Sequence, residues 1–132
     1  RYLRDGGPAY ARAEVPSAQE AIEATSQAGG VSVVAHPRSL RMENRRGYER
    51  LIRMMQEAGL TGIEVDHPSH DTTRRVLFSD IARSLDLVPS GGSDFHGANK
   101  PHIELGIGDG TIEVHYETWE RLLERRPTPG VA

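Results

Sequence analysis

Three residues of this chain have the types and spacing of ligands for a hydrolytic metal ion. His36 stands in the segment VVAHP, and Asp94 and His96 stand in SGGSDFHG. Neutral imidazole nitrogen and carboxylate oxygen are the donors that such metals use, and Asp94-Phe95-His96 puts one of each on one side of a tight segment. The preceding Gly-Gly-Ser run lets the backbone approach a metal closely. These residues therefore predict part of a metal site.

The same residues and their neighbours admit other interpretations. Taken alone, a histidine before proline is more often a strand-end residue bonded to backbone, and Asp94 could cap a turn, although His96 would then have no role. In DHPSHD, His67 and His70 could chelate a metal, bind a substrate phosphate or face solvent. Of these two, His70 is favoured as a residue that contacts substrate.

Charged side chains near the candidate ligands bear on what the site could bind. Arg38 and Lys100 lie close to the ligand segments in sequence and could neutralise a phosphate, and Arg38 is the better candidate. Glu64 and Asp66 are two residues apart in a predicted strand and are expected to point to the same side, without a ligand assignment. SGGSD lacks the spacing of either phosphate-binding fingerprint of nucleotide folds. The expected chemistry is therefore metal-dependent.

Composition limits this chemistry further. The chain has 132 residues, a formal net charge of -3 and no cysteine. One domain, or part of one, is expected at this length. Without thiolates, a metal must be held by imidazole and carboxylate, which favours Mn, Fe or Zn, with Mg possible if oxygen ligands dominate. The charge gives no basic field for duplex nucleic acid, and the lack of a long apolar run predicts a cytoplasmic protein without a membrane partner.

The elements that must position these residues alternate between helix and strand. Ser17 and Glu20 form a capping box, and short apolar runs rich in β-branched residues predict buried parallel strands. Val76, Leu77, Ile81 and Leu85 keep the helical period, and Trp119, Leu122 and Leu123 are expected to face inward. Helices are expected at 17–28, 48–58, 71–85 and 116–126, and strands at 31–35, 62–65, 87–90 and 103–107.

These repeated strand and helix units imply an α/β fold with parallel strands and outer helices. The sheet could be open or part of a barrel, and three or four units make about half of a (β/α) barrel. His36 follows the first strand, His67 the second, and Asp94 and His96 the third. Because α/β folds place their active sites at the carboxyl ends of the strands, these side chains are expected to converge.

Three segments also resemble a known family. AGGVSVVAHP, GLTGIEVDHPSHD and VPSGGSDFHG, in this order, resemble the C-terminal half of a PHP-domain protein, of the polymerase and histidinol phosphatase superfamily. The likeness is strongest to its stand-alone nucleotide phosphoesterase branch. The resemblance implies a distorted (β/α)7 barrel. It assigns residues 1–16 to the end of an inserted segment, 17–126 to the C-terminal half of the barrel and 127–132 to a tail.

The resemblance also implies a set of functional residues and a reaction. His36, Asp94 and His96 match metal ligands of a cluster of two or three divalent ions, with Asp94 and His96 catalytic, and Arg38 and His70 would bind substrate. The remaining ligands lie upstream in the family, so the chain is expected to be an inactive fragment that needs a missing N-terminal half as its partner. The implied activity is hydrolysis of phosphomonoesters of nucleotides or short oligonucleotides by a metal-activated water.

Two alternatives to this activity stay open. A PHP-type exonuclease domain of a DNA polymerase would carry the same motifs, although the ending PTPGVA is expected to be a tail and weighs against this alternative. A metal-free domain retained for protein contacts is the other alternative, and the intact SDFH segment weighs against it.

Overall fold

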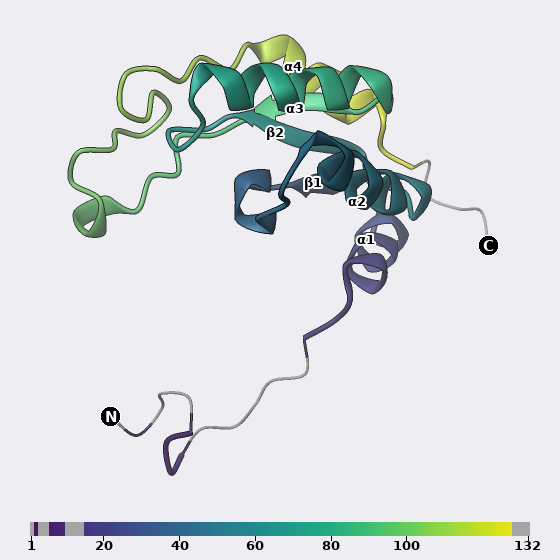
Figure 1. The fold of residues 1–132 in the computed structure, drawn as a ribbon, viewed down its shortest axis with the longest axis horizontal. Helices are drawn as coiled ribbons and strands as arrows, with labels where there is room; N and C mark the ends of the chain where they lie inside the picture. The colour runs from purple at the N-terminus through teal and green to yellow at the C-terminus, as the bar shows by residue number, and fades with distance from the viewer. Residues whose placement is uncertain (1, 3–5, 10–14, 128–132) are drawn as a thin grey trace.

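The chain folds around a three-stranded parallel sheet. A computed structural model describes residues 2, 6–9 and 15–127 (Figure 1). The strands lie in the order β1-β2-β3 and are all parallel. They are β1 (Val33–Val34), β2 (Gly62–Asp66) and β3 (Val88–Gly91), and the helices are α1 (Ala18–Gln27), α2 (Arg45–Glu57), α3 (Thr72–Ser84) and α4 (Tyr116–Glu124), with two short 3-10 turns, η1 (Pro37–Leu40) and η2 (Gly97–Asn99).

The predicted α/β alternation is confirmed, with parallel strands joined through helices. Three strands are too few to form the expected (β/α)7 barrel, so the described residues show a parallel α/β sheet and not the closed barrel. The expected inserted segment (1–16) and tail (127–132) fall largely outside the described residues. Among the residues that the structure describes, no helix has the length and apolar character needed to span a bilayer.

Local capping explains where the helices begin. The Ser17 amide donates to Oε2 of Glu20 at 2.8 Å and the Glu20 amide donates to Oγ of Ser17 at 3.2 Å, which is the expected capping box. Helix α3 begins after Asp71, whose carboxylate accepts from the Arg74 amide at 2.8 Å. The Asn44 side chain caps α2, so this helix begins three residues before the predicted start at 48.

The hydrophobic core lies between β2 and the helices α2 and α3. Ile52, Ile63 and Phe78 are fully buried, and the Phe78 ring packs edge-on against Tyr48 with centroids 5.2 Å apart. Helix α3 packs along β2 and β3, as Figure 1 shows. Val76 keeps the apolar period of α3, but its side chain lies outside this core and is 57% exposed.

Two predictions near the C-terminus are corrected. Trp119 and Leu123 on α4 were expected to face inward, yet they are 53% and 39% exposed. Residues 103–107 do not form a strand of the sheet, because Glu104 and Gly108 make an isolated antiparallel bridge that closes a tight loop. This loop follows the end of β3 and lies on the side of the sheet where the candidate site is found.

A β-bulge alters the pairing of β2 and β3 at their carboxyl ends. Glu64 pairs with Ser90 and Asp66 pairs with Gly91, so two steps along β2 match one step along β3. A Cβ atom on Gly91 would lie 2.7 Å from the Cβ of Asp66 and 2.9 Å from a methyl group of Val114. The glycine therefore permits the close approach of the two strands where their loops leave the sheet.

Candidate metal centre

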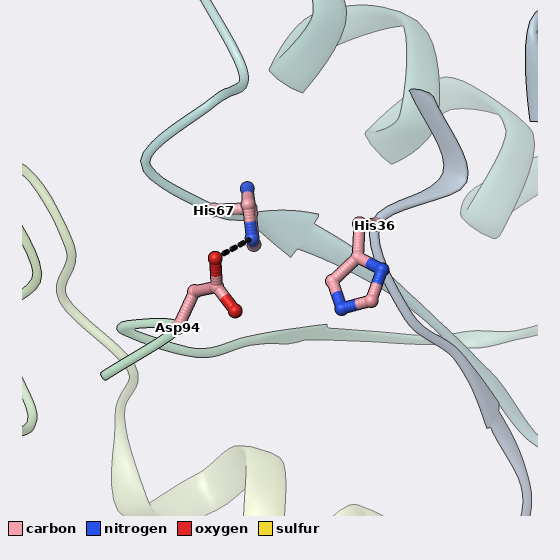
Figure 2. A group of neighbouring side chains, drawn as sticks. All are labelled: His36, His67 and Asp94. Atoms are coloured by element: carbon pink, nitrogen blue, oxygen red, sulfur yellow. Dashed lines mark ion pairs between the residues drawn. The ribbon is translucent and has the colours of Figure 1, made fainter. Parts of the chain in front are cut away.

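The carboxyl ends of the three strands bring together His36, His67 and Asp94. One ligand atom from each lies within 4.8 Å of the others. Figure 2 shows the three side chains, each from a different strand end, converging on one space. Nε2 of His67 lies 3.5 Å from Oδ2 of Asp94, and the rings of His36 and His67 meet edge-on with centroids 5.3 Å apart. The predicted convergence at this edge is therefore observed for His36, His67 and Asp94, but not for His96.

Two members of this group sit in a strained backbone conformation. His36 has φ 36° and Asp94 has φ 53°, both in the left-handed region. Such a conformation costs a non-glycine residue on the order of 1–3 kcal/mol and is concentrated at functional sites. The chain turns sharply after β1 and again after β3, and both turns direct a candidate ligand toward His67.

The Glu64 carboxylate supports the turn that carries His36. The His36 amide donates to Oε2 of Glu64 at 2.5 Å, and the carboxylate is half-buried beneath the site. Burial raises the pKa of Glu64, with a smaller contribution from the nearby Asp94 charge. Asp66 has a different partner, Nη1 of Arg75 at 3.5 Å. The two acids of β2 thus make different contacts, and Glu64 is the one that touches the ligand turn.

His67 directs a buried ring nitrogen toward the group. Its Nδ1 accepts a hydrogen bond from the Ser69 amide at 3.0 Å and lies 2.8 Å from Oγ of Ser69. Within the described residues, its buried Nε2 has no hydrogen-bond partner. Burial is the main cause that lowers the pKa of His67, so the ring is favoured in its neutral form. A neutral imidazole is the form that binds a metal.

His70 lies behind His67 and is fixed in one tautomer. Its Nδ1 donates to the carbonyl oxygen of Val65 at 2.8 Å, which leaves Nε2 without a proton. This Nε2 is also buried and, in the part of the chain described, unpaired. The side chain is only 3% exposed, between His67 and Phe78. Burial lowers the pKa of His70, so it too is favoured as a neutral acceptor.

Basic side chains flank the group on two sides. A cavity of about 380 Å³ is lined by His36, Arg38, Ser39, Arg41 and Ser69, and Nη1 of Arg38 donates to the Ser69 carbonyl at 3.2 Å. On the other side, the Lys100 ammonium pairs with Oδ2 of Asp94. Its hydrogen bond is the main reason that the pKa of Asp94 is lowered, so this carboxyl is favoured as the anion.

The donor set fits a divalent cation. Two imidazoles and one carboxylate are the ligand types of Mn, Fe and Zn sites. The buried Nε2 of His67 lies 3.5 Å from Oδ2 of Asp94 and has no hydrogen-bond partner among the described residues. Three protein ligands are also the number found where zinc keeps an open position for water or substrate. The arrangement can therefore hold a metal ion that is accessible to a ligand.

Comparison with known proteins gives the family. The chain is 34% identical over 125 residues to a 3',5'-nucleoside bisphosphate phosphatase of Chromobacterium violaceum, covering 95% of this chain and 44% of that protein. It is 31% identical over 122 residues to a 5'-3' exoribonuclease of Haemophilus influenzae, covering 92% and 44%. The chain belongs to the PHP superfamily. No family model matches it.

A solved structure extends the comparison of this PHP chain to three dimensions. A protein of Bifidobacterium adolescentis, provisionally assigned as a metal-dependent phosphoesterase, superimposes with a TM-score of 0.69 and 34% identity. The match covers 89% of this chain and 40% of that one. The PHP chain therefore spans less than half the length of the relatives it matches.

The PHP site groups two of the three predicted ligands, and His67 joins them. His36 and Asp94 lie together as expected, but the His96 side chain is 53% exposed and its Nδ1 lies 2.7 Å from the backbone oxygen of Asp94. His96 is therefore not in the group of three. The sequence favours His70 over His67 as a site residue, although the position of His67 directly after the strand at 62–66 is a signal for its place in the group.

Proposed function

We propose that the protein is a metal-dependent phosphoesterase that hydrolyses phosphomonoesters of nucleotides or short oligonucleotides. The observation that carries this proposal is the group of His36, His67 and Asp94, with ligand atoms within 4.8 Å of one another at the carboxyl edge of a parallel sheet. The names of the relatives, a nucleoside bisphosphate phosphatase and an exoribonuclease, support the substrate class.

The residues of the group would share the work of such a reaction. His36, His67 and Asp94 would hold a divalent ion, which supplies a Lewis acid and a bound water of lowered pKa. Arg38 would bind a phosphate oxygen from the basic cavity beside His36, because its guanidinium presents several donors in a fixed plane. Nε2 of His70 would accept a hydrogen bond once a substrate or a shift of the loop reaches it.

A complete site would need more ligands than this group contains. We propose a cluster of two or three ions, with Mn, Fe, Zn or Mg as candidates, in a distorted (β/α)7 barrel whose C-terminal part is residues 17–126. The further ligands would come from a segment outside these 132 residues. His96 would join the cluster as a ligand and catalytic residue if its ring turned away from the Asp94 carbonyl. This chain matches 44% of the length of the nucleoside bisphosphate phosphatase, which supports the proposal that further ligands lie outside it.

The proposal is tested by phosphate release from a 3',5'-nucleoside bisphosphate and from a 5'-phosphorylated oligonucleotide, using the full-length protein with Mn²⁺. Substitution of residues that only support metal ligands lowers activity about 10- to 100-fold, so loss of a direct ligand in Asp94→Asn should lower it at least about 100-fold. Asp86→Asn is the matched control, because Asp86 has a similar positive φ but pairs with Arg125 at the surface. Equal activity of the Asp94 variant and the control would contradict the proposal.

A further inference from the structure

Lys100 is the one lysine in the sequence, since the remaining 15 of the 16 Lys and Arg residues are arginines. Its ammonium pairs with Oδ2 of Asp94. Elsewhere in the described chain, surface acids such as Asp71 and Asp86 pair with arginine. The candidate metal ligand Asp94 is thus paired with an ammonium group, whereas these two surface acids are paired with guanidinium groups.

The lysine pairs with the oxygen of Asp94 that lies toward His67. Oδ2 of Asp94 is also the atom that lies 3.5 Å from Nε2 of His67, whereas Oδ1 lies 3.5 Å from Nδ1 of the exposed His96. A cation bound between His67 and Asp94 would therefore meet the ammonium of Lys100 at the same carboxylate oxygen. Two positive charges within a few ångströms repel each other, so a cation bound at this oxygen would weaken the hold of Asp94 on the Lys100 ammonium.

A lysine side chain can leave this carboxylate more readily than an arginine side chain can. An arginine would hold the carboxylate through two parallel hydrogen bonds, whereas an ammonium is a point charge on a flexible four-carbon stem. The Lys100 side chain is 39% exposed, so it has room to move. Displacement of the ammonium costs one ion pair and leaves Asp94 free to bind a metal.

A displaced ammonium would have an adjacent space to enter. A cavity of about 310 Å³ lies on this side of the site. Its lining combines the apolar Pro68 and Ile103 with the polar residues His67, Ser69, Asp94, Lys100, His102 and Asp109. It borders the candidate metal position at His67 and Asp94. Lys100 carries the permanent positive charge on this wall, beside the carboxylates of Asp94 and Asp109, so an anion in the cavity would depend on the Lys100 ammonium and on a cation bound to Asp94.

We propose that Lys100 is a substrate-binding residue whose ammonium is held on Asp94 until a divalent cation displaces it, after which it binds a phosphate oxygen in this cavity. The inference rests on the proposed function, because it assumes that Asp94 is a metal ligand and that the substrate carries phosphate. It gives Lys100 two opposite effects. The side chain weakens metal binding and strengthens phosphate binding.

The test measures both effects in the full-length protein. Lys100→Met removes the charge and keeps the stem, Lys100→Arg keeps the charge, and Arg83→Met is a control on α3, where Arg83 is 78% exposed and bonded to Asp80. Mn²⁺ binding is followed by the EPR signal of free Mn²⁺, at the site that Asp94→Asn removes. Inorganic phosphate binding to the Mn²⁺-saturated protein is followed by calorimetry.

We expect Mn²⁺ affinity to fall in the order Met, Lys, Arg at position 100, with the Met variant about tenfold tighter than the native protein, within the usual range of coupling between two ligands. Phosphate should bind the Mn²⁺-loaded Met variant about tenfold more weakly, while Arg83→Met changes neither. The inference is overturned if the Met variant binds Mn²⁺ no more tightly or binds phosphate equally well. Should the Met variant not fold, an Arg variant that binds Mn²⁺ as tightly as the native protein overturns it.

These outcomes are distinguishable from failure of the proposed function. Native protein that releases phosphate, with Mn²⁺ affinity independent of residue 100, would contradict the role of Lys100 alone. The expected order of Mn²⁺ affinities without hydrolysis of any phosphoester would contradict the proposed function and leave the displacement of Lys100 supported.

Discussion

The helix-covered core and the carboxyl edge of the sheet follow opposite rules. In the core, Ile52, Ile63 and Phe78 are fully buried and apolar. At the edge, His36 and Asp94 have positive φ, and two buried histidines leave a nitrogen unpaired within the described chain. Burial of apolar area stabilises the fold, whereas strain and unpaired polar atoms cost stability. The apolar core therefore stabilises the fold, and the strained residues and unpaired nitrogens at the carboxyl edge reduce that stability.

The largest effect is expected from removal of core volume. Phe78→Ala should lower the free energy of unfolding by about 3–5 kcal/mol, because a fully buried ring that packs on Tyr48 is lost and a cavity remains. Urea unfolding followed by circular dichroism measures the change. Val76→Ala on the same helix is the control, since Val76 is exposed and should change stability by less than about 0.5 kcal/mol. Similar losses in the two variants would show that the core is not where the stability lies.

An intermediate effect is expected where the two regions join. Gly91→Ala should destabilise the protein by about 1–3 kcal/mol, because the added Cβ would lie 2.7–2.9 Å from Asp66 and Val114 and would push β3 from β2. Unfolding in urea measures this loss, and Mn²⁺ affinity should fall with it because the loop to Asp94 begins here. Adding Val114→Ala removes one of the contacts, so the double variant should recover part of the loss. A fully additive pair would contradict this explanation.

The smallest change in stability at neutral pH is expected at the edge itself. His70→Asn keeps a donor for the Val65 carbonyl, exchanges the unpaired Nε2 for an amide oxygen and loses ring contacts with Phe78, so stability should fall by about 1 kcal/mol while phosphoesterase activity falls. Stability is measured by urea unfolding and activity by phosphate release. Loss of stability with unchanged activity would mean that His70 belongs to the core and not to the site.

The same variant tests the pH dependence of the edge. Burial lowers the pKa of His70 below its unfolded value near 6.5, so the native state disfavours the proton that the unfolded state takes up. The stability that His70 contributes is present above about pH 6.5 and is lost as the pH falls through its folded pKa. Unfolding between pH 7.5 and 5 should therefore show a smaller loss in His70→Asn than in the native protein. An unchanged slope would exclude His70 as a source of the acid sensitivity.

The sequence determined the features that depend on neighbours along the chain. The capping box of Ser17 and Glu20 and the cap at Asp71 fix helix starts, and short apolar runs between helices specify parallel strands. Since the carboxyl ends of parallel strands lie at one edge of a sheet, the sequence pattern also predicted that His36 and Asp94 lie close together. Each of these features follows from backbone geometry and hydrogen bonds within a few residues.

Only the tertiary structure decided which side chains meet across loops. It grouped His67 with His36 and Asp94, left His96 exposed, and paired Asp94 with Lys100. Helical periodicity also misplaced Trp119, because a period shows which residues share a face but not whether another element covers that face. Loop turns at positive φ and a bulge between strands set the direction of each ligand, and those conformations arise from packing between distant segments.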